Sequence, residues 1–199
     1  MLKFRDGEII QPTMTLMNTS KVSVITILVA LCIATNYALA GVPNVKAMDF
    51  LVFVGGFCFG PLAGALIGII TWVVYGVVNP YGFVLQVWLA TIFSESIYGL
   101  FGGFLGKSFA STNFNNYHLS LSILFGTVAF ILTLIYDLIT TVVYAPMFGV
   151  PILIAIIVGM PFTVLHEFSN AIIFGMSSVP IITRLEKLLG GDRFGISKK

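Results

Sequence analysis

The sequence predicts an all-α integral membrane protein that crosses the bilayer six times as a single membrane domain. Hydrophobic residues make up 58% of the 199 positions, charged residues make up only 9%, and the mean hydropathy is +1.03. Soluble proteins carry roughly 25% charged residues, and a soluble chain of this length could not bury so many apolar side chains. The composition therefore excludes a soluble enzyme, a nucleic-acid-binding protein and a disordered chain, and it indicates a multi-pass protein of the cell membrane.

Long apolar runs indicate where the membrane helices lie. In chain order, we predict helices over 22–40, 47–59, 61–79, 84–106, 120–145 and 161–183, between cytoplasmic tails at 1–20 and 185–199. The second and third helices come from one nearly uncharged run, Phe50–Val78. At 1.5 Å per residue this run is about 44 Å long, whereas a hydrocarbon core is about 30 Å thick. Gly60-Pro61 divides the run, because proline lacks a backbone N–H and restricts the residue before it.

The last three helices are separated by two segments of different character. Lys107 and His118 belong to the loop between the fourth and fifth helices. Residues 146–160, between the fifth and sixth helices, are apolar but short, and prolines at 146, 151 and 161 bound them. This segment is expected to be either a re-entrant segment or an early extension of the sixth helix.

The basic residues decide the number of spans and the orientation. Five spans would put the two basic ends of the chain on opposite sides of the membrane, whereas six put both ends and Lys107 together and leave only Lys46 opposite. The nine residues on the shared side are Lys3, Arg5, Lys21, Lys107, Arg184, Lys187, Arg193, Lys198 and Lys199. Because cytoplasmic loops are rich in Lys and Arg, we predict six spans with both termini in the cytoplasm.

Four carboxylates fall inside the predicted spans, at Asp49, Glu95, Asp137 and Glu167. An intramembrane carboxylate is costly and is a candidate functional group by default. In the predicted topology all four lie in the outer half of the membrane or near its midplane. Asp49 has a simpler alternative, which is to pair with Lys46 about one helical turn away.

Aromatic and polar side chains follow these carboxylates at spacings of three, four or seven residues, which place each set on one helical face. Together they describe an outward-open cavity for a small molecule, lined by aromatic rings and a few polar groups. The candidate ligand contacts are Asp49, Trp72, Tyr75, Asn79, Trp88, Glu95, Tyr98, Tyr136, Asp137, Tyr144, His166, Glu167 and Asn170. Trp and Tyr also gather at membrane interfaces, which is an alternative explanation for Trp88 and Tyr144.

Small residues recur every four positions in two places. On the first helix they are Thr26, Ala30, Ala34 and Ala38, and around the second turn they are Gly56, Gly60, Gly64 and Gly68. Such faces let helices approach closely in lipid. We expect the glycines to pack the second helix against the third. The alanine stripe is either internal packing or an outward face that docks another membrane subunit.

Two sequence motifs suggest enzymatic chemistry but do not meet its requirements. Gly102–Ser108 resembles a phosphate-binding loop, yet it has the wrong glycine spacing and closes a helix, whereas such a loop must follow a strand and open a helix. His166–Asn170 resembles a zinc-protease helix, but its last residue is not histidine and a zinc site needs three protein ligands. We therefore expect no enzyme activity, no ATPase, no metal and no cofactor in this chain.

Five segments resemble the substrate-binding S components of energy-coupling factor (ECF) vitamin transporters. They are Asn44–Phe50, Gly56–Ala65, Asn79–Phe83, Tyr136–Thr140 and Pro161–Asn170. The resemblance extends over about residues 22–183. It implies a six-helix protein that binds a vitamin or related micronutrient with high affinity in an outward-facing cavity. It also implies two kinds of partner, a transmembrane coupling subunit and two ATPase subunits.

The resemblance also assigns roles to two short segments. The loop after the first helix, with Val42, Pro43, Asn44 and Lys46, is implied to act as a gate over the ligand. The family's Ala-xxx-Ala contact with the coupling subunit maps onto Ala30 and Ala34.

The ligand is left open by the sequence. Four acids against one base in the membrane region favour a cationic or donor-rich compound, and Trp72, Tyr75 and Tyr98 suit an aromatic ring. A thiamine- or pyrimidine-like ligand and a cobalamin-related one both fit this description. The alternative function is a stand-alone proton- or ion-coupled carrier with Asp137 and Glu167 as the proton sites.

Overall fold

The computed structural model describes residues 4–5, 8–9, 19–80, 82–110 and 118–188, so most of the two expected tails lies outside it. The described residues form six helices: α1 (Thr19–Ala38), α2 (Met48–Phe59), α3 (Pro61–Val78), α4 (Leu85–Ser108), α5 (His118–Met147) and α6 (Ile152–Leu188). Before α1, β1 (Phe4–Arg5) and β2 (Glu8–Ile9) form a two-residue antiparallel pair. The helices from α3 to α6 are long and apolar enough to cross a membrane. The apolar parts of α1 (Val22–Ala38) and α2 are shorter.

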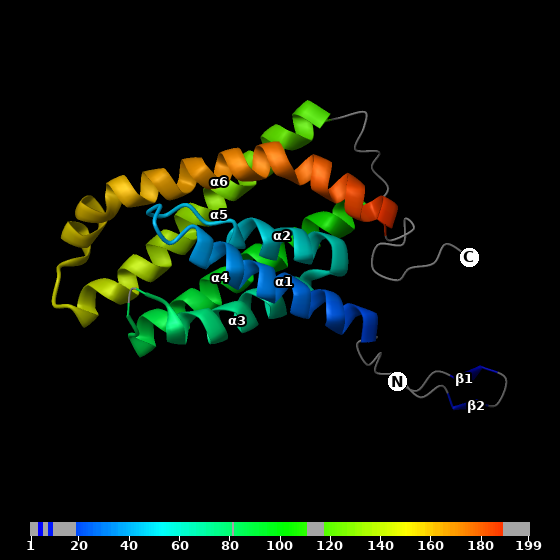
Figure 1. The fold of residues 1–199 in the computed structure, drawn as a ribbon, viewed down its shortest axis with the longest axis horizontal. Helices are drawn as coiled ribbons and strands as arrows, with labels where there is room; N and C mark the ends of the chain where they lie inside the picture. Colours follow the sequence, from blue (N-terminus) through cyan, green and yellow to red (C-terminus); the bar gives the residue numbers. More distant parts are fainter. Residues whose placement is uncertain (1–3, 6–7, 10–18, 81, 111–117, 189–199) are drawn as a thin grey trace.

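Successive helices run in alternating directions along the long axis of the bundle (Figure 1). The beginning of α1, the end of α4 and the end of α6 therefore lie at the same end of the molecule. The loop between α1 and α2 lies at the opposite end (Figure 1). Lys107 in the last turn of α4 and Lys187 in the last turn of α6 are at the first of these ends, and Lys46 is at the second.

Helix α2 forms the centre of the fold, with ten of its twelve residues buried. It contacts α1, α3, α4 and α6. Its Phe53 ring lies 5.9 Å from the ring of Phe125 on α5 and 5.2 Å from that of Phe174 on α6. These aromatic contacts make one apolar core that reaches from α2 to the pair formed by α5 and α6.

The glycines around the α2–α3 turn pack α2 against α3, as expected, and bring α4 into the same contact. A Cβ atom at Gly56 or at Gly64 would overlap the backbone of Gly99 on α4. The glycine-rich end of α4 contributes in the same way, because a Cβ at Gly102 would overlap the carbonyl of Phe53. The segment that resembles a phosphate-binding loop is thus part of a close helix crossing, where only the absence of a side chain lets the backbones meet.

Most of the segment 146–160 is an early extension of the sixth helix, which is one of the two expected alternatives. Helix α5 continues to Met147, and α6 begins at Ile152, well before the expected start at 161. The short connection turns at Gly149, which has a φ of 67°. Pro161 and Pro180 both lie inside α6, so neither proline ends the helix.

Candidate functional site

A buried network of hydrogen bonds joins α2, α5 and α6 near the centre of the molecule. His166 on α6 lies between two carboxylates, with its Nε2 atom 2.9 Å from Asp49 Oδ2 and its Nδ1 atom 3.0 Å from Asp137 Oδ1. The side chains of His166 and Asp49 are completely buried, and that of Asp137 is 12% exposed. Because an ionised carboxylate only accepts hydrogen bonds, the imidazole carries a proton on both nitrogens when both acids are ionised.

Neutral side chains extend this network to α4. The amide nitrogen of Asn170 donates to Asp49 Oδ2 at 2.7 Å and to Thr133 Oγ1 at 2.9 Å. The Tyr98 hydroxyl donates to the same Thr133 oxygen at 2.8 Å. His166 and Asn170 are four residues apart on α6, as are Thr133 and Asp137 on α5, so each pair lies on one helical face.

Glu95 on α4 lies beside this network and is completely buried. The Trp72 indole on α3 donates to Glu95 Oε2 at 3.2 Å, and the Trp88 indole donates to the Trp72 carbonyl at 2.8 Å. The other carboxylate oxygen, Glu95 Oε1, accepts no hydrogen bond from any described residue, and the same holds for Asp49 Oδ1. We refer to Asp49, Glu95, Thr133, Asp137, His166 and Asn170 as the central cluster.

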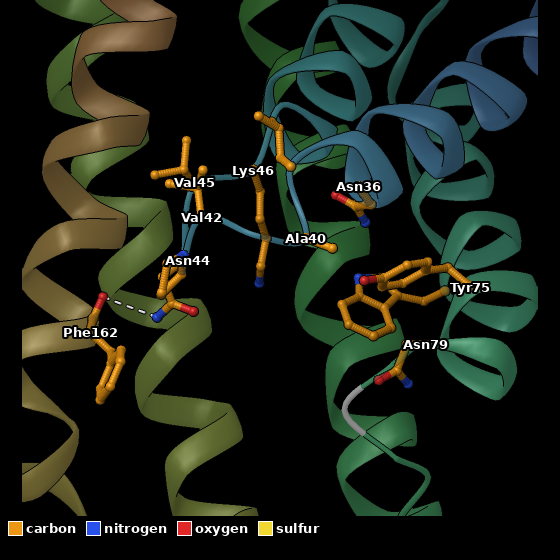
Figure 2. Close-up of a pocket in the computed structure, with 12 residues that line it drawn as sticks. Asn36, Ala40, Val42, Asn44, Val45, Lys46, Tyr75, Asn79 and Phe162 are labelled. Atoms are coloured by element: carbon orange, nitrogen blue, oxygen red, sulfur yellow. Dashed lines mark hydrogen bonds between the residues drawn. The ribbon is translucent and has the colours of Figure 1, made fainter.

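A cavity of about 460 Å³ opens beside the central cluster, beneath the loop between α1 and α2. Figure 2 shows its two sides, with Asn44 and Phe162 on one and Asn36, Tyr75 and Asn79 on the other. The lining residues come from α1, the loop, α3 and α6: Asn36, Leu39, Ala40, Val42, Pro43, Asn44, Val45, Lys46, Trp72, Tyr75, Asn79 and Phe162. Aromatic rings and amide groups thus dominate the side of the cavity formed by the helices.

Lys46 is the charged residue in this lining. Its side chain runs from the loop into the cavity (Figure 2), and its Nζ atom lies 4.8 Å from the centre of the Tyr136 ring and 5.9 Å from that of Trp72. Among the described residues, none forms an ion pair or a hydrogen bond with the ammonium group. The expected alternative for Asp49 is therefore not what the structure shows, because Asp49 bonds to His166 and Asn170 instead of Lys46.

The loop over the cavity is fastened mainly through Asn44. Its amide nitrogen donates to the Phe162 carbonyl at 3.0 Å, and its own carbonyl accepts a bond of 3.4 Å from the Ser169 hydroxyl. Asn44 has a φ of 51°, in the left-handed region that asparagine tolerates better than most residues. All four residues of the expected gate, including Val42 and Pro43, line the cavity.

Two of the candidate ligand contacts lie in a neighbouring groove instead. Trp88 and Tyr144 line a groove of about 440 Å³, which shares Trp72 and Asn79 with the cavity under the loop. Tyr144 is 45% exposed and stacks on Phe148, with ring centres 4.4 Å apart. The position of Tyr144 agrees with the alternative of an interfacial aromatic residue.

Glu167 is separated from the cavity as well. It lines a groove of about 270 Å³ between α5 and α6, together with Asp137. Asp137 therefore connects this groove to the central cluster, because it also bonds to His166. Tyr136, next to it on α5, is buried and lies edge-on to the His166 ring at 5.9 Å.

The alanine stripe of α1 faces outward. Thr26, Ala30, Ala34 and Ala38 are all exposed, whereas Ile25 and Val29 on the opposite face are buried. Of the two expected alternatives, the structure shows the outward face, and internal packing was wrong.

Three residues of the site were not among the sequence candidates. Asn36 lines the cavity and donates to the Met48 sulfur at 3.1 Å; its amide group near the end of an apolar run was the available signal. Thr133 lies one turn before Asp137, and the spacing in the sequence places it on the same polar face of the fifth helix, although it was not among the expected ligand contacts. Phe162 takes part through its carbonyl oxygen, which no side-chain pattern reveals.

Comparison of the chain with protein-family models, with curated proteins and with solved structures finds no match. The cavity and the central cluster are therefore the features from which a function can be inferred.

Proposed function

We propose that this protein is a high-affinity membrane binding subunit for the uptake of a vitamin or related micronutrient, driven by a separate ATP-hydrolysing ECF module. The observation that carries the proposal is the cavity of about 460 Å³ under the α1–α2 loop. Its volume lies within the range of about 300–1,000 Å³ found for small-molecule sites, and its mixture of rings and amides is typical of them. The polar cluster beside it is the kind of intramembrane feature that marks a transport pathway.

In this proposal all six helices lie in the membrane, α2 being shorter than the hydrocarbon core, and the cavity opens to the outside. The distribution of charge supports that orientation, because Lys107 and Lys187 lie at the end of the bundle opposite the cavity. Basic residues favour the cytoplasmic side. Asn36 lines the cavity, and its Oδ1 atom accepts no hydrogen bond from the described residues. The cavity volume favours a thiamine- or pyrimidine-like compound over a cobalamin-related one, which is far larger.

The coupling subunit is proposed to dock on the outward face of α1. Ala30 and Ala34 are exposed there, one turn apart, beside the exposed apolar side chains of Ile27 and Leu31. A small-residue face lets another helix approach closely. The chain itself would bind and carry the ligand, while the two ATPase subunits would supply the energy.

Ligand binding is tested by calorimetry of the purified protein with a vitamin panel, alongside mass spectrometry of any compound released on denaturation. We expect one compound to bind with a dissociation constant well below micromolar. If no compound in the panel binds at micromolar concentration and none is released, the proposed function is wrong.

The coupling role is tested with Ala34→Trp in cells that contain the ECF module. We expect unchanged ligand binding and loss of uptake, because the bulky ring separates the docked helices. Val158→Trp is the matched control, since Val158 is 68% exposed on α6, away from the stripe, and this variant should retain uptake. Loss of binding in Ala34→Trp would contradict the assigned role of this face.

A stand-alone proton-coupled carrier is the second candidate, and one observation favours it. The chain from Asp49 through His166 to Asp137 leads from the central cluster to the groove that contains Glu167. Such a line of titratable groups is typical of proton relays in carriers. Uptake of the identified ligand by this protein alone, in liposomes with a proton gradient and no ATP, would establish it.

A further inference from the structure

Lys46 already places a positive charge in the lining of the cavity. The Lys46 ammonium lies over the Tyr136 ring and near the Trp72 ring, at 4.8 and 5.9 Å from their centres. Both rings are nearly buried, with exposed fractions of 4% and 9%. Ring faces attract cations through their quadrupole, and two of them side by side make a position suited to an organic cation.

Two nearby carboxyl groups also stabilise a positive charge at this position. Lys46 lies within electrostatic range of Asp49 and Glu95, although neither pairs with it directly. Each of these two carboxyl groups keeps one buried oxygen, Asp49 Oδ1 and Glu95 Oε1, that accepts no hydrogen bond from the described residues. A buried acceptor without a donor is unfavourable, so a donor that reaches these oxygens would be held strongly.

The charge balance agrees with an exchange of one cation for another. Glu95 interacts directly with Asp49, and two neighbouring carboxyl groups in a buried site share one proton. The remaining negative charges on Asp49 and Asp137 are then matched by Lys46 and a doubly protonated His166. A cationic group that replaces the Lys46 ammonium keeps this balance, whereas an anionic ligand would disturb it.

We propose that Lys46 is a tethered substitute for the ligand's own positive charge. The ligand is a planar organic cation with N–H donors, and its charged group takes the position between the Trp72 and Tyr136 rings and displaces the Lys46 ammonium. This inference rests on the proposed function, since it names the ligand class of the same cavity.

Lys46 is well placed for such an exchange. It is fastened by ring contacts and by charges at a distance, without an ion pair or a hydrogen bond to the described residues, so an entering cation breaks no close bond. It also belongs to the loop that covers the cavity, two residues from the anchor Asn44 and two before the start of α2 at Met48. Displacement of Lys46 is therefore coupled to the loop, and binding of the ligand and opening of the loop become one equilibrium.

The first experiment uses three planar probes of nearly equal shape: benzamidinium, which is cationic, benzamide, which is neutral, and benzoate, which is anionic. Their affinities are measured for the full-length protein and for Lys46→Met, which keeps the length of the side chain and removes its charge. We expect the wild type to prefer benzamidinium. In Lys46→Met the affinity for benzamidinium should rise about fivefold, because the competing ammonium is gone, while that for benzamide changes little.

Lys107→Met is the matched control, because Lys107 is an exposed lysine at the far end of the bundle and its loss should leave all three affinities unchanged. Preferred binding of benzoate, weakened in Lys46→Met, would overturn the inference and assign Lys46 to an anionic group of the ligand. Binding of none of the probes would overturn it as well. A vitamin that still bound in the calorimetric panel would show that the proposed function survives this failure.

The second experiment observes Lys46 directly in the wild-type protein. Lysines are acetylated for a short time with and without each probe, and the modification of Lys46 relative to Lys107 is measured by mass spectrometry. We expect benzamidinium to increase the rate at Lys46 and benzamide to leave it unchanged. A slower rate with benzamidinium would mean that the cation binds on top of Lys46 without displacing it, which contradicts the exchange.

Discussion

Thr133 and Asn170 are the neutral residues that connect the charged groups of the central cluster. Thr133 Oγ1 accepts hydrogen bonds from both Tyr98 and Asn170, and Asn170 passes the connection on to Asp49. All four side chains are buried, so water cannot replace a lost partner. Removing one buried acceptor leaves its donors unsatisfied, which costs more than the net worth of the bond.

We predict that Thr133→Val, which preserves the shape of the side chain, lowers the free energy of unfolding by about 1–3 kcal/mol. The Tyr98 hydroxyl and the Asn170 amide would each lose an acceptor. Unfolding in detergent, followed by circular dichroism, measures the effect. Thr127→Val is the control on the same helix, because Thr127 is exposed and, within the described part of the chain, bonds to the Ile123 carbonyl one turn away. Equal losses in the two variants would contradict a structural role for the cluster.

Sequence spacing predicted part of this cluster and could not predict the rest. The separation of four residues between His166 and Asn170 suffices to place them on one face. That this face meets Asp49 depends on how α2 and α6 pack, and these helices are far apart in the chain. The expected pairing of Lys46 with Asp49 failed for another reason. Lys46 precedes the first turn of α2, so a helical spacing rule that pairs it with Asp49 does not apply.

At the scale of elements, the crossing of α2, α3 and α4 depends on backbone contact. A Cβ atom at Gly99 would overlap the carbonyl group of Gly64, and one at Gly103 would overlap Pro61. The four-residue repeat in the sequence predicted close packing of α2 and α3 but gave no sign that α4 would be the partner. The sequence also left open whether the sixth helix extends through Pro161. Membrane helices tolerate proline where neighbouring groups satisfy the backbone groups that it frees, so the proline alone does not mark a helix start.

We predict that Gly99→Ala destabilises the protein by about 1–3 kcal/mol, because the added methyl group forces the helix backbones apart. Gly159→Ala is the matched control, since a Cβ there meets no atom within 4 Å. Alanine should even stabilise α6 at that position by about 0.5–1 kcal/mol, because it restricts the unfolded chain. The melting temperatures of both variants in the same detergent measure the contrast. A fall of equal size in both would contradict the close crossing.

At the scale of the whole molecule, the two ends of the bundle differ in charge and shape. One end carries Lys107 and Lys187 in terminal helical turns, and the other carries the loop with Lys46 over the cavity. Counting basic residues in the sequence predicted this separation without any knowledge of packing, because orientation depends on where charges lie along the chain. The shape of the cavity, in contrast, depends on contacts among α1, α3 and α6.

We predict that Gly41→Cys reacts with a membrane-impermeant thiol reagent added outside the cell and that Ser108→Cys does not. Both positions are exposed, and they lie at opposite ends of the bundle. Cys32 and Cys58 are 0% and 1% exposed, so the native thiols should give little background. Labelling of both variants after the membrane is permeabilised serves as the control. Labelling of Ser108→Cys in intact cells would overturn the orientation.

The shortness of α2 has an electrical consequence. Its twelve residues rise about 18 Å, roughly 12 Å less than the thickness of the hydrocarbon core. In the proposed orientation the start of α2, and with it the ammonium of Lys46, lies below the outer membrane surface. A positive ligand that moves to this depth crosses part of the transmembrane voltage, which is worth about 2.3 kcal/mol per charge for each 100 mV when crossed completely. The Lys46 ammonium that it displaces moves outward through the same voltage. The two movements offset one another, so a polarised cell and a depolarised cell capture the ligand with nearly equal affinity.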